Sequence, residues 1–163
     1  MDAAALTPPT MEGALERLSE EFDLLGDWEQ RYRYVIDLGR DLPLLEEAQY
    51  SDANKVRGCA SQVWLVATSN TDGSIEFRGD SDAHIVKGLI AILLGLFSSR
   101  KPADILAFDA KAAFARLGLT GALSSQRSNG LFAMVERIRA EATSAQAARP
   151  PIASPPASPI TES

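Results

Sequence analysis

Apolar side chains recur at three- and four-residue spacing near the start of the chain, which indicates two amphipathic helices. The first helix follows Thr10, a suitable N-cap. Its apolar face consists of Met11, Leu15, Leu18, Phe22 and Leu25. The second begins after Asp27, with Gln30 in position for a capping box, and ends at Gly39 and Pro43. We expect its buried side to carry Trp28, Tyr32, Val35, Ile36 and Gly39.

The middle of the chain changes to a strand pattern. Residues 62–69 are rich in apolar and β-branched side chains, and residues 74–79 alternate as their partner strand. Between them, residues 71–74 place Asp-Gly at the centre of a hairpin turn. Residues 52–54 form a turn signal, after which residues 55–56 start a short strand. We therefore expect a small antiparallel sheet of about three strands.

The second half of the chain returns to a helical period. Residues 83–97 are apolar almost all round, so this helix should be buried against the sheet. A short helical turn at residues 103–106 and a helix at 109–117 follow, and Gly118 and Gly121 break the chain. A final helix spans residues 128–143. Its apolar face carries Leu131, Met134, Val135 and Ile138. Helices, sheet and helices in this order predict an α+β fold with the helices packed on one face of the sheet.

Length and composition fit one globular domain. The chain has 163 residues, 45% hydrophobic and 23% charged, enough to bury a core. We assign residues 1–10 to a flexible N-terminus and residues 11–143 to the domain. Residues 144–163 are rich in Pro, Ala and Ser and predict a disordered tail.

Charge and hydropathy exclude several classes of protein. A net charge of -6 lacks the basic footprint of a nucleic-acid-binding protein. The longest apolar run, residues 89–97, is too short for a membrane span, which needs ~20 residues. No secretory signal pattern opens the chain, so we expect a cytoplasmic protein that contacts no membrane.

Candidate chemistry centres on Cys59, the only cysteine in the chain. A single cysteine can form neither an intramolecular disulfide nor a cysteine-based zinc site. It is either a reactive thiolate or a small buried hydrophobe, and its position alone leaves both open. Lys55 and Arg57 could lower the pKa of the thiol, because nearby positive charge favours the thiolate. Gly58 permits positive φ and close approach by a partner.

A second pattern, Asp-x-Asp-x-His, suggests a metal at Asp80, Asp82 and His84. Only one turn of ligands is present, and no second cluster accompanies it. We favour the alternative that Ser81 or Asp82 caps the following helix. No P-loop and no dinucleotide fingerprint occurs, so we expect neither a metal nor a cofactor on this chain.

Residues 56–65, which read VRGCASQVWL, resemble the cysteine loop of the SufE family of sulfur-acceptor proteins. Three further blocks resemble family segments in the family's order: DWEQRYRY and LGRDLP within residues 27–43, GDSDA and VKGL within residues 79–89, and SQRSNGL at residues 125–131. The resemblance extends over roughly residues 11–142, and four blocks in the family's order are far more specific than one short motif.

This resemblance implies both a fold and a function. The SufE fold is α+β and is shared with the scaffold proteins of iron–sulfur cluster assembly. Cys59 would attack the persulfide of a SufS-like cysteine desulfurase, an enzyme expected to carry pyridoxal phosphate. It would store the sulfur as its own persulfide and pass it to a SufBCD-like scaffold complex, as a sulfur carrier rather than an enzyme in its own right. We expect Cys59 to lie against apolar groups in the free protein and to swing out on docking.

Other site residues follow from the same resemblance. Candidates for shaping the loop or contacting the partner are Arg57, Gly58, Ser61, Gln62, Asp82 and Arg127. Arg127 resembles a family arginine near the cysteine loop, where it would pair with Asp82 or steady the loop at the partner surface. An ion pair that only stabilises the fold is the alternative.

Several alternatives remain at this stage. The paralogous CsdE branch serves a different desulfurase, and the motifs do not separate the two branches. A cysteine hydrolase would need His84 as the base beside Cys59. A cluster scaffold is rejected for this chain as a lone subunit, because a scaffold needs several thiolate or imidazole ligands and the chain has one cysteine and one histidine. The sequence leaves open the final sulfur acceptor and whether the protein is a homodimer.

Overall fold

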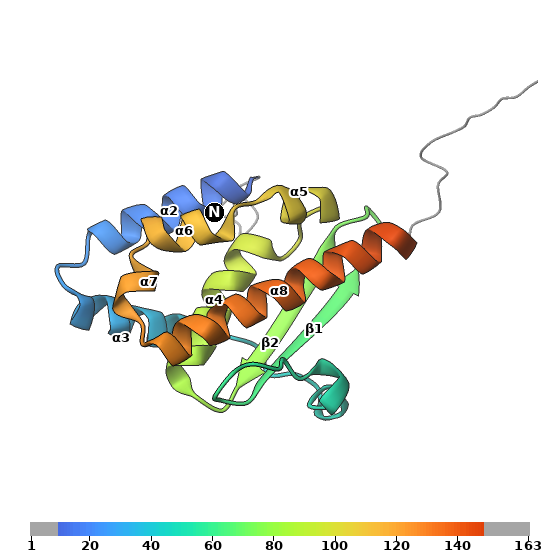
Figure 1. The fold of residues 1–163 in the computed structure, drawn as a ribbon, viewed down its shortest axis with the longest axis horizontal. Helices are drawn as coiled ribbons and strands as arrows, with labels where there is room; N and C mark the ends of the chain where they lie inside the picture. Colours follow the sequence, from blue (N-terminus) through green and yellow to red (C-terminus); the bar gives the residue numbers. More distant parts are fainter. Residues whose placement is uncertain (1–9, 149–163) are drawn as a thin grey trace, which may run out of the picture.

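The computed structural model describes residues 10–148, and residues 1–9 and 149–163 lie outside this range. The elements in chain order are α2 (Met11–Asp23), α3 (Trp28–Arg40), the 3₁₀ turns η1 (Glu47–Gln49) and η2 (Asp52–Asn54), β1 (Val63–Ser69), β2 (Ile75–Ser81), α4 (His84–Phe97), α5 (Pro102–Ala107), α6 (Ala110–Arg116), α7 (Leu119–Ala122) and α8 (Ser125–Ala148). The fold is α+β, as predicted. Figure 1 shows α4 at the centre, α2 and α3 on one side of it, and α8 crossing α4 and the hairpin.

The two predicted N-caps are present. Thr10 Oγ1 accepts a hydrogen bond from the backbone N–H of Gly13 at 3.0 Å, which starts α2. Asp27 Oδ1 accepts from the N–H of Gln30 at 2.9 Å, which starts α3. The side chain of Gln30 reaches back to Gly26 N at 3.3 Å instead of to Asp27, so the reciprocal bond lies one residue earlier than in a capping box.

The hairpin of β1 and β2 forms as predicted. Its antiparallel register places Val63 opposite Ser81 and Ser69 opposite Ile75. Gly73 adopts a positive φ of 92° in the connecting turn, a conformation that glycine takes without steric cost. Alternate side chains of the two strands are buried on one face of the sheet: Val63, Leu65, Ile75 and Phe77. This face packs against α4.

Among residues 10–148 the sheet has two strands, not about three, so the predicted strand at residues 55–56 is wrong. Lys55 makes a single bridge to Trp64 and the ladder stops there. The reason is local, because η2 ends at Asn54 and Gly58 turns the chain at φ 90°. Too few extended residues remain between these turns to form a ladder.

The buried helix predicted at residues 83–97 is α4, which forms the centre of the core. It meets α3 at very short range: a Cβ added to Gly88 would lie 2.0 Å from the carbonyl oxygen of Val35. A Cβ on Gly39 would lie 2.6 Å from Gly88 N. Glycine at both positions lets the two backbones touch. The α3–α4 crossing therefore depends on these two glycines.

One residue of the predicted buried face of α3 is exposed. Tyr32 keeps 42% of its surface in contact with solvent, whereas Val35 on the same helix keeps 1%. Tyr32 lies at the edge of an apolar cavity of about 60 Å³ that α7 helps to enclose. An edge position leaves the hydroxyl of a tyrosine hydrated, which apolar periodicity alone does not reveal.

The last helices differ from the prediction at their ends. Gly118 breaks the chain at φ 75° as expected, but Gly121 lies inside the short helix α7. The last helix, α8, spans Ser125–Ala148 and exceeds the predicted 128–143 at both ends. Ser124 Oγ accepts from Arg127 N at 3.2 Å and so supports the earlier start. Residues 144–148 are therefore helical instead of part of a disordered tail, and the remainder of that predicted tail lies outside the described residues.

Candidate functional site

Cys59 lies on the segment that we call the cysteine loop, residues 57–62, which leads into β1. A backbone hydrogen bond from Val56 N to Val63 O, 2.8 Å long, closes the base of this loop. Inside the loop, Gly58 has a φ of 90°, so the turn before the cysteine needs a glycine. The predicted loop-shaping role of Gly58 thus has a geometric basis.

Asp82 fastens the far end of the cysteine loop. Its Oδ1 accepts a hydrogen bond from Gln62 N at 3.1 Å, and Gln62 O accepts from Asp82 N at 3.3 Å. Asp82 does not cap α4, because the N-cap is Ala83, which makes no side-chain bond. Ser81 Oγ accepts from Ala83 N at 3.2 Å just before that helix. Of the predicted roles of Asp82, the helix cap is therefore wrong, and its observed contact is with Gln62.

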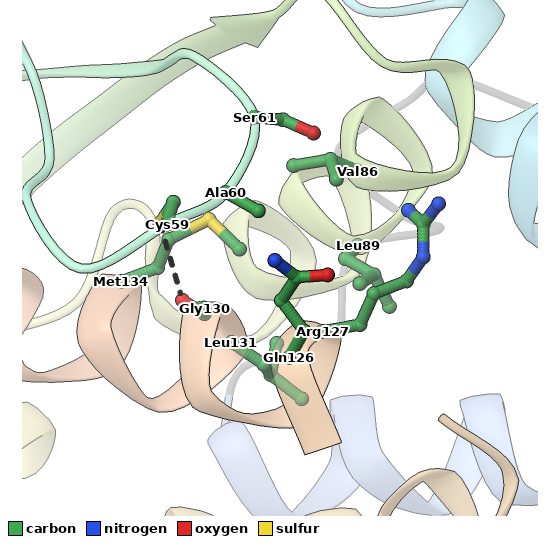
Figure 2. Close-up of a pocket in the computed structure, with 10 residues that line it drawn as sticks. All are labelled: Cys59, Ala60, Ser61, Val86, Leu89, Gln126, Arg127, Gly130, Leu131 and Met134. Atoms are coloured by element: carbon green, nitrogen blue, oxygen red, sulfur yellow. Dashed lines mark hydrogen bonds between the residues drawn. The ribbon is translucent and has the colours of Figure 1, made fainter. Parts of the chain in front are cut away.

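The thiol of Cys59 faces a cavity of about 70 Å³ beneath the loop (Figure 2). Apolar side chains from two helices line this cavity: Val86 and Leu89 from α4, Leu131 and Met134 from α8. The Sγ of Cys59 lies 3.6 Å from the carbonyl oxygen of Gly130, as a weak S–H donor. Cys59 is half-buried, and the expectation that it lies against apolar groups in this unbound chain is confirmed.

Burial raises the pKa of the Cys59 thiol above its ordinary value, because the apolar surroundings disfavour the thiolate. The prediction that Arg57 and Lys55 lower this pKa is therefore wrong for the resting loop. Arg57 is exposed, so water screens its charge and weakens its attraction for a thiolate at Cys59. In this conformation the thiol is protected rather than activated.

Polar side chains of Ser61, Gln126 and Arg127 border the cavity. Figure 2 shows the amide of Gln126 beside the cavity and the guanidinium of Arg127 turned away from Cys59. Among residues 10–148, Arg127 forms no ion pair, with Asp82 or with any other carboxylate. Both the pairing with Asp82 and the fold-stabilising ion pair are thus absent from the part of the chain that the structure describes. A partner contact of Arg127 stays a prediction.

The candidate metal pattern is not assembled into a site. Asp80 is buried and accepts a hydrogen bond from the hydroxyl of Tyr50 at 2.6 Å, with Lys87 Nζ 3.5 Å away. Asp82 is bonded to the cysteine loop, and His84 is exposed at the start of α4. Within residues 10–148, no group of three or more His, Cys, Asp or Glu side chains is placed to hold a metal ion. His84 does not line the cavity of Cys59 either, so this conformation brings no base to the thiol.

Sequence reasoning missed the residues that shelter the thiol. Val86 and Leu89 were assigned to a buried helix, and Leu131 and Met134 to an apolar helix face, but none of them to the site. Their three-residue spacing, on two helices, was the available signal, because i and i+3 residues share one helix face. The contact of Gly130 with a cysteine 71 positions away carries no sequence signal of its own.

Fold and site together define a class of protein: a small α+β domain that presents one sheltered thiol on a loop between a 3₁₀ turn and a strand. The chain belongs to the SufE family, since residues 16–142 match the family described as "Fe-S metabolism associated domain".

Two relatives are SufE-like proteins of rhizobia. The chain is 52% identical over 132 residues to an "Uncharacterized SufE-like protein" of Rhizobium etli, a match that covers 79% of this chain and 89% of the relative. It is 48% identical over 132 residues to another of Rhizobium meliloti, with 79% and 94% covered. These relatives and the family match connect the protein with Fe–S metabolism.

A solved structure shares the fold. The solution structure of a hypothetical protein from Thermus thermophilus superposes with a TM-score of 0.67 and 19% sequence identity. The match covers 87% of this chain and 99% of the other, and at this identity it supports the fold alone. In the described part of the chain, no helix is long and apolar enough to cross a bilayer.

Proposed function

We propose that this protein accepts sulfane sulfur from a cysteine desulfurase onto Cys59 and relays it to an iron–sulfur scaffold complex. The observation that carries the proposal is the position of Cys59: a half-buried thiol on a loop, over an apolar cavity of about 70 Å³. One additional sulfur atom on Sγ is small compared with this space. Membership of the SufE family connects the same chain with Fe–S metabolism.

The proposed step is an exchange at sulfur. The thiolate of Cys59 attacks the terminal sulfur of the desulfurase persulfide, and the S–S bond of the donor breaks. The electron pair of that bond leaves on the donor cysteine, which becomes a thiolate, while the terminal sulfur and its proton end on Cys59 as a persulfide. No external oxidant or reductant is consumed. The same exchange in the next step passes the sulfur to a thiolate of the scaffold complex.

The conformation described here suits storage rather than attack. Attack needs a thiolate with access to the donor sulfur, whereas Cys59 is half-buried and has a raised pKa. We therefore propose that the cysteine loop leaves the cavity when a desulfurase docks. In the partner's site Cys59 loses its apolar cover, so its thiolate becomes accessible. On return, the cavity shields the persulfide from reductants.

The test is intact-mass spectrometry of the full chain after incubation with a cysteine desulfurase, pyridoxal phosphate and cysteine. We expect a mass gain of one sulfur atom, reversed by reductant and absent from Cys59→Ser. A parallel incubation without desulfurase is the control for nonspecific sulfuration. Desulfurases of the SufS and CsdE-associated kinds are tried separately, which distinguishes the two family branches. Absence of added sulfur with every desulfurase would contradict the proposal.

A further inference from the structure

The segment before the cysteine loop is fastened to α8 by one side chain. Arg137 donates from Nη2 to the carbonyl oxygen of Ala53 at 2.8 Å and from Nη1 to that of Lys55 at 3.2 Å. Its Nε donates to Glu141 Oε2 at 3.0 Å, one helical turn further along α8. A planar guanidinium can make these three bonds at once, because its donors point in fixed directions.

Core packing fixes this segment at its last residue, Val56, which keeps 5% of its surface exposed. The 3₁₀ turn η2 contains no buried residue, so packing contributes little to its position. A side-chain bond from Asn54 to Gln49 O, 3.0 Å long, ties it only to another exposed turn. Lys55 makes one isolated bridge to Trp64. The hydrogen bonds that join η2 and Lys55 to the helical core are thus those of the Arg137 guanidinium.

We propose that Arg137 is a positioning residue for sulfur transfer. This proposal rests on the proposed function of Cys59. Arg137 fixes the hinge from which the cysteine loop moves, on the side of η2. Asp82 fixes the opposite end through Gln62, and the bond between Val56 and Val63 closes the base. With both ends fastened, motion is confined to the cysteine loop itself, and η2 stays on α8.

A fixed hinge limits where the thiol can travel. Cys59 lies three positions after Val56, so the cysteine can extend about 10 Å from this anchor at ~3.3–3.6 Å per residue. The loop thus presents Cys59 within a small volume beside its own cavity. Without Arg137, η2 would lose its bonds to α8 and the anchor at Val56 would be held by its own packing and its bond to Val63 alone. The thiol would then populate more positions that do not fit a partner's site. Fewer molecules would then be competent to dock.

The same helix provides a matched control. Arg139 is also half-buried on α8, and its Nη1 donates to the carbonyl oxygen of Leu106 at 3.0 Å. That bond fastens α5 instead of the cysteine loop. Arg139→Gln therefore removes an arginine–carbonyl bond and one positive charge from the same helix without touching the hinge.

The experiment compares wild type, Arg137→Gln and Arg139→Gln as full chains in two assays that need no desulfurase. Hydrogen exchange followed by mass spectrometry reports the backbone at residues 52–56, and alkylation by iodoacetamide reports Cys59, the only thiol. In Arg137→Gln we expect both rates to rise on the order of tenfold, since charged hydrogen bonds to two carbonyls are lost. Both rates should stay at the wild-type value in Arg139→Gln. Equal rates in the two variants would overturn the proposal.

Two further measurements separate positioning from general destabilisation. Arg137→Lys keeps the charge but cannot span both carbonyls, so it should show a smaller rise in exchange than Arg137→Gln, and it also serves if Arg137→Gln does not fold.

With a desulfurase, Arg137→Gln should raise the KM for this acceptor and leave kcat unchanged. If wild type accepts no sulfur, the proposed function fails, while the exchange and alkylation rates still decide the role of Arg137. Wild-type rates in both Arg137 variants would contradict the fixed hinge.

Discussion

At the scale of single residues, the environment of Cys59 keeps its thiol protected in the resting loop. Apolar side chains from α4 and α8 surround the thiol and raise its pKa. A thiol with a raised pKa reacts slowly in its resting position, because the thiolate is the nucleophile. Under the proposed function, we therefore expect the reactivity of Cys59 to rise when its loop leaves the cavity.

This shift predicts the pH dependence of Cys59. In the folded protein the rate of alkylation by iodoacetamide should rise with pH along a curve whose midpoint lies above the ordinary thiol pKa of about 8.5. The control is the same chain unfolded in urea, whose midpoint should lie at the ordinary value. The raised pKa also stabilises the fold below the unfolded-state pKa, and this contribution is lost as pH rises through the folded-state pKa. Coincident midpoints in the two states would contradict a sheltered thiol.

Gly130 offers a second test at this scale, Gly130→Ala. A Cβ at this position would lie 3.6 Å from Cys59 Sγ, an ordinary contact that needs no rearrangement. Alanine in a helix interior is favoured over glycine, so the free energy of unfolding should rise by up to about 1 kcal/mol. The added methyl occupies space beside the sulfur, so a Cys59 persulfide should be reduced faster by dithiothreitol. Denaturant melts measure the free energy of unfolding, and the lifetime of the persulfide in dithiothreitol measures its reduction. A longer lifetime in Gly130→Ala would argue against storage in this cavity.

The sequence alone identified Cys59 and the bend at Gly58, because both depend on residue types that are adjacent in the chain. The direction of the thiol pKa could not be predicted this way. It depends on Leu131 and Met134, which reach Cys59 only after α8 docks. The contacts of Arg137 were missed for the same reason, since they join residues 82 and 84 positions apart.

At the scale of elements, the α3–α4 crossing predicts opposite effects for two glycines of the same helix. Gly88→Ala places a Cβ 2.0 Å from the backbone oxygen of Val35, so the helices must separate. We expect the free energy of unfolding to fall by about 3 kcal/mol. At Gly95 nothing lies within 4 Å of the new Cβ, so Gly95→Ala should raise the free energy of unfolding by up to about 1 kcal/mol. Denaturant melts of both variants check this, and equal shifts would contradict the close crossing.

Elements with a continuous pattern were predictable from the sequence. Three features depend only on residues that are near one another in the sequence: the period of two in the hairpin, its Asp-Gly turn and the apolar length of α4. Three features were not local. Residues 55–56 make one bridge and no ladder, and α7 forms beside Gly118 although Gly121 lies within it. The helix α8 begins at the polar Ser125 because Ser124 caps it. Such boundaries depend on hydrogen bonds that residue periodicity does not encode.

At the scale of the whole molecule, cationic side chains lie near the thiol of an acidic protein. The net charge is -6, yet Arg57 and Arg127 flank the site and form no ion pair among residues 10–148. Complementary charge contributes to association more than to the chemical step. We therefore expect the docking surface of the proposed partner to be acidic.

Arg57→Glu tests this surface. We expect the KM of the desulfurase for this acceptor to rise by up to about fivefold at low salt, the range of an exposed ion pair, with kcat unchanged. The difference from wild type should shrink as salt is added, because salt screens exposed charges. Lys111→Glu on α6, a helix that contributes no residue to the cavity, is the matched control with the same charge change. Equal KM values for the two variants would contradict an acidic docking surface.

The origin of the cavity walls has a consequence for biosynthesis. Gly130, which contacts the sulfur, lies 71 positions after Cys59 in the chain. At about 5–20 residues per second, a ribosome adds that length in about 4 to 14 s. Throughout this interval the nascent chain carries its thiol without the helix that will cover it. Each molecule thus passes through a short period in which cellular oxidants reach Cys59 more easily than they do when the loop rests on its cavity in the finished protein.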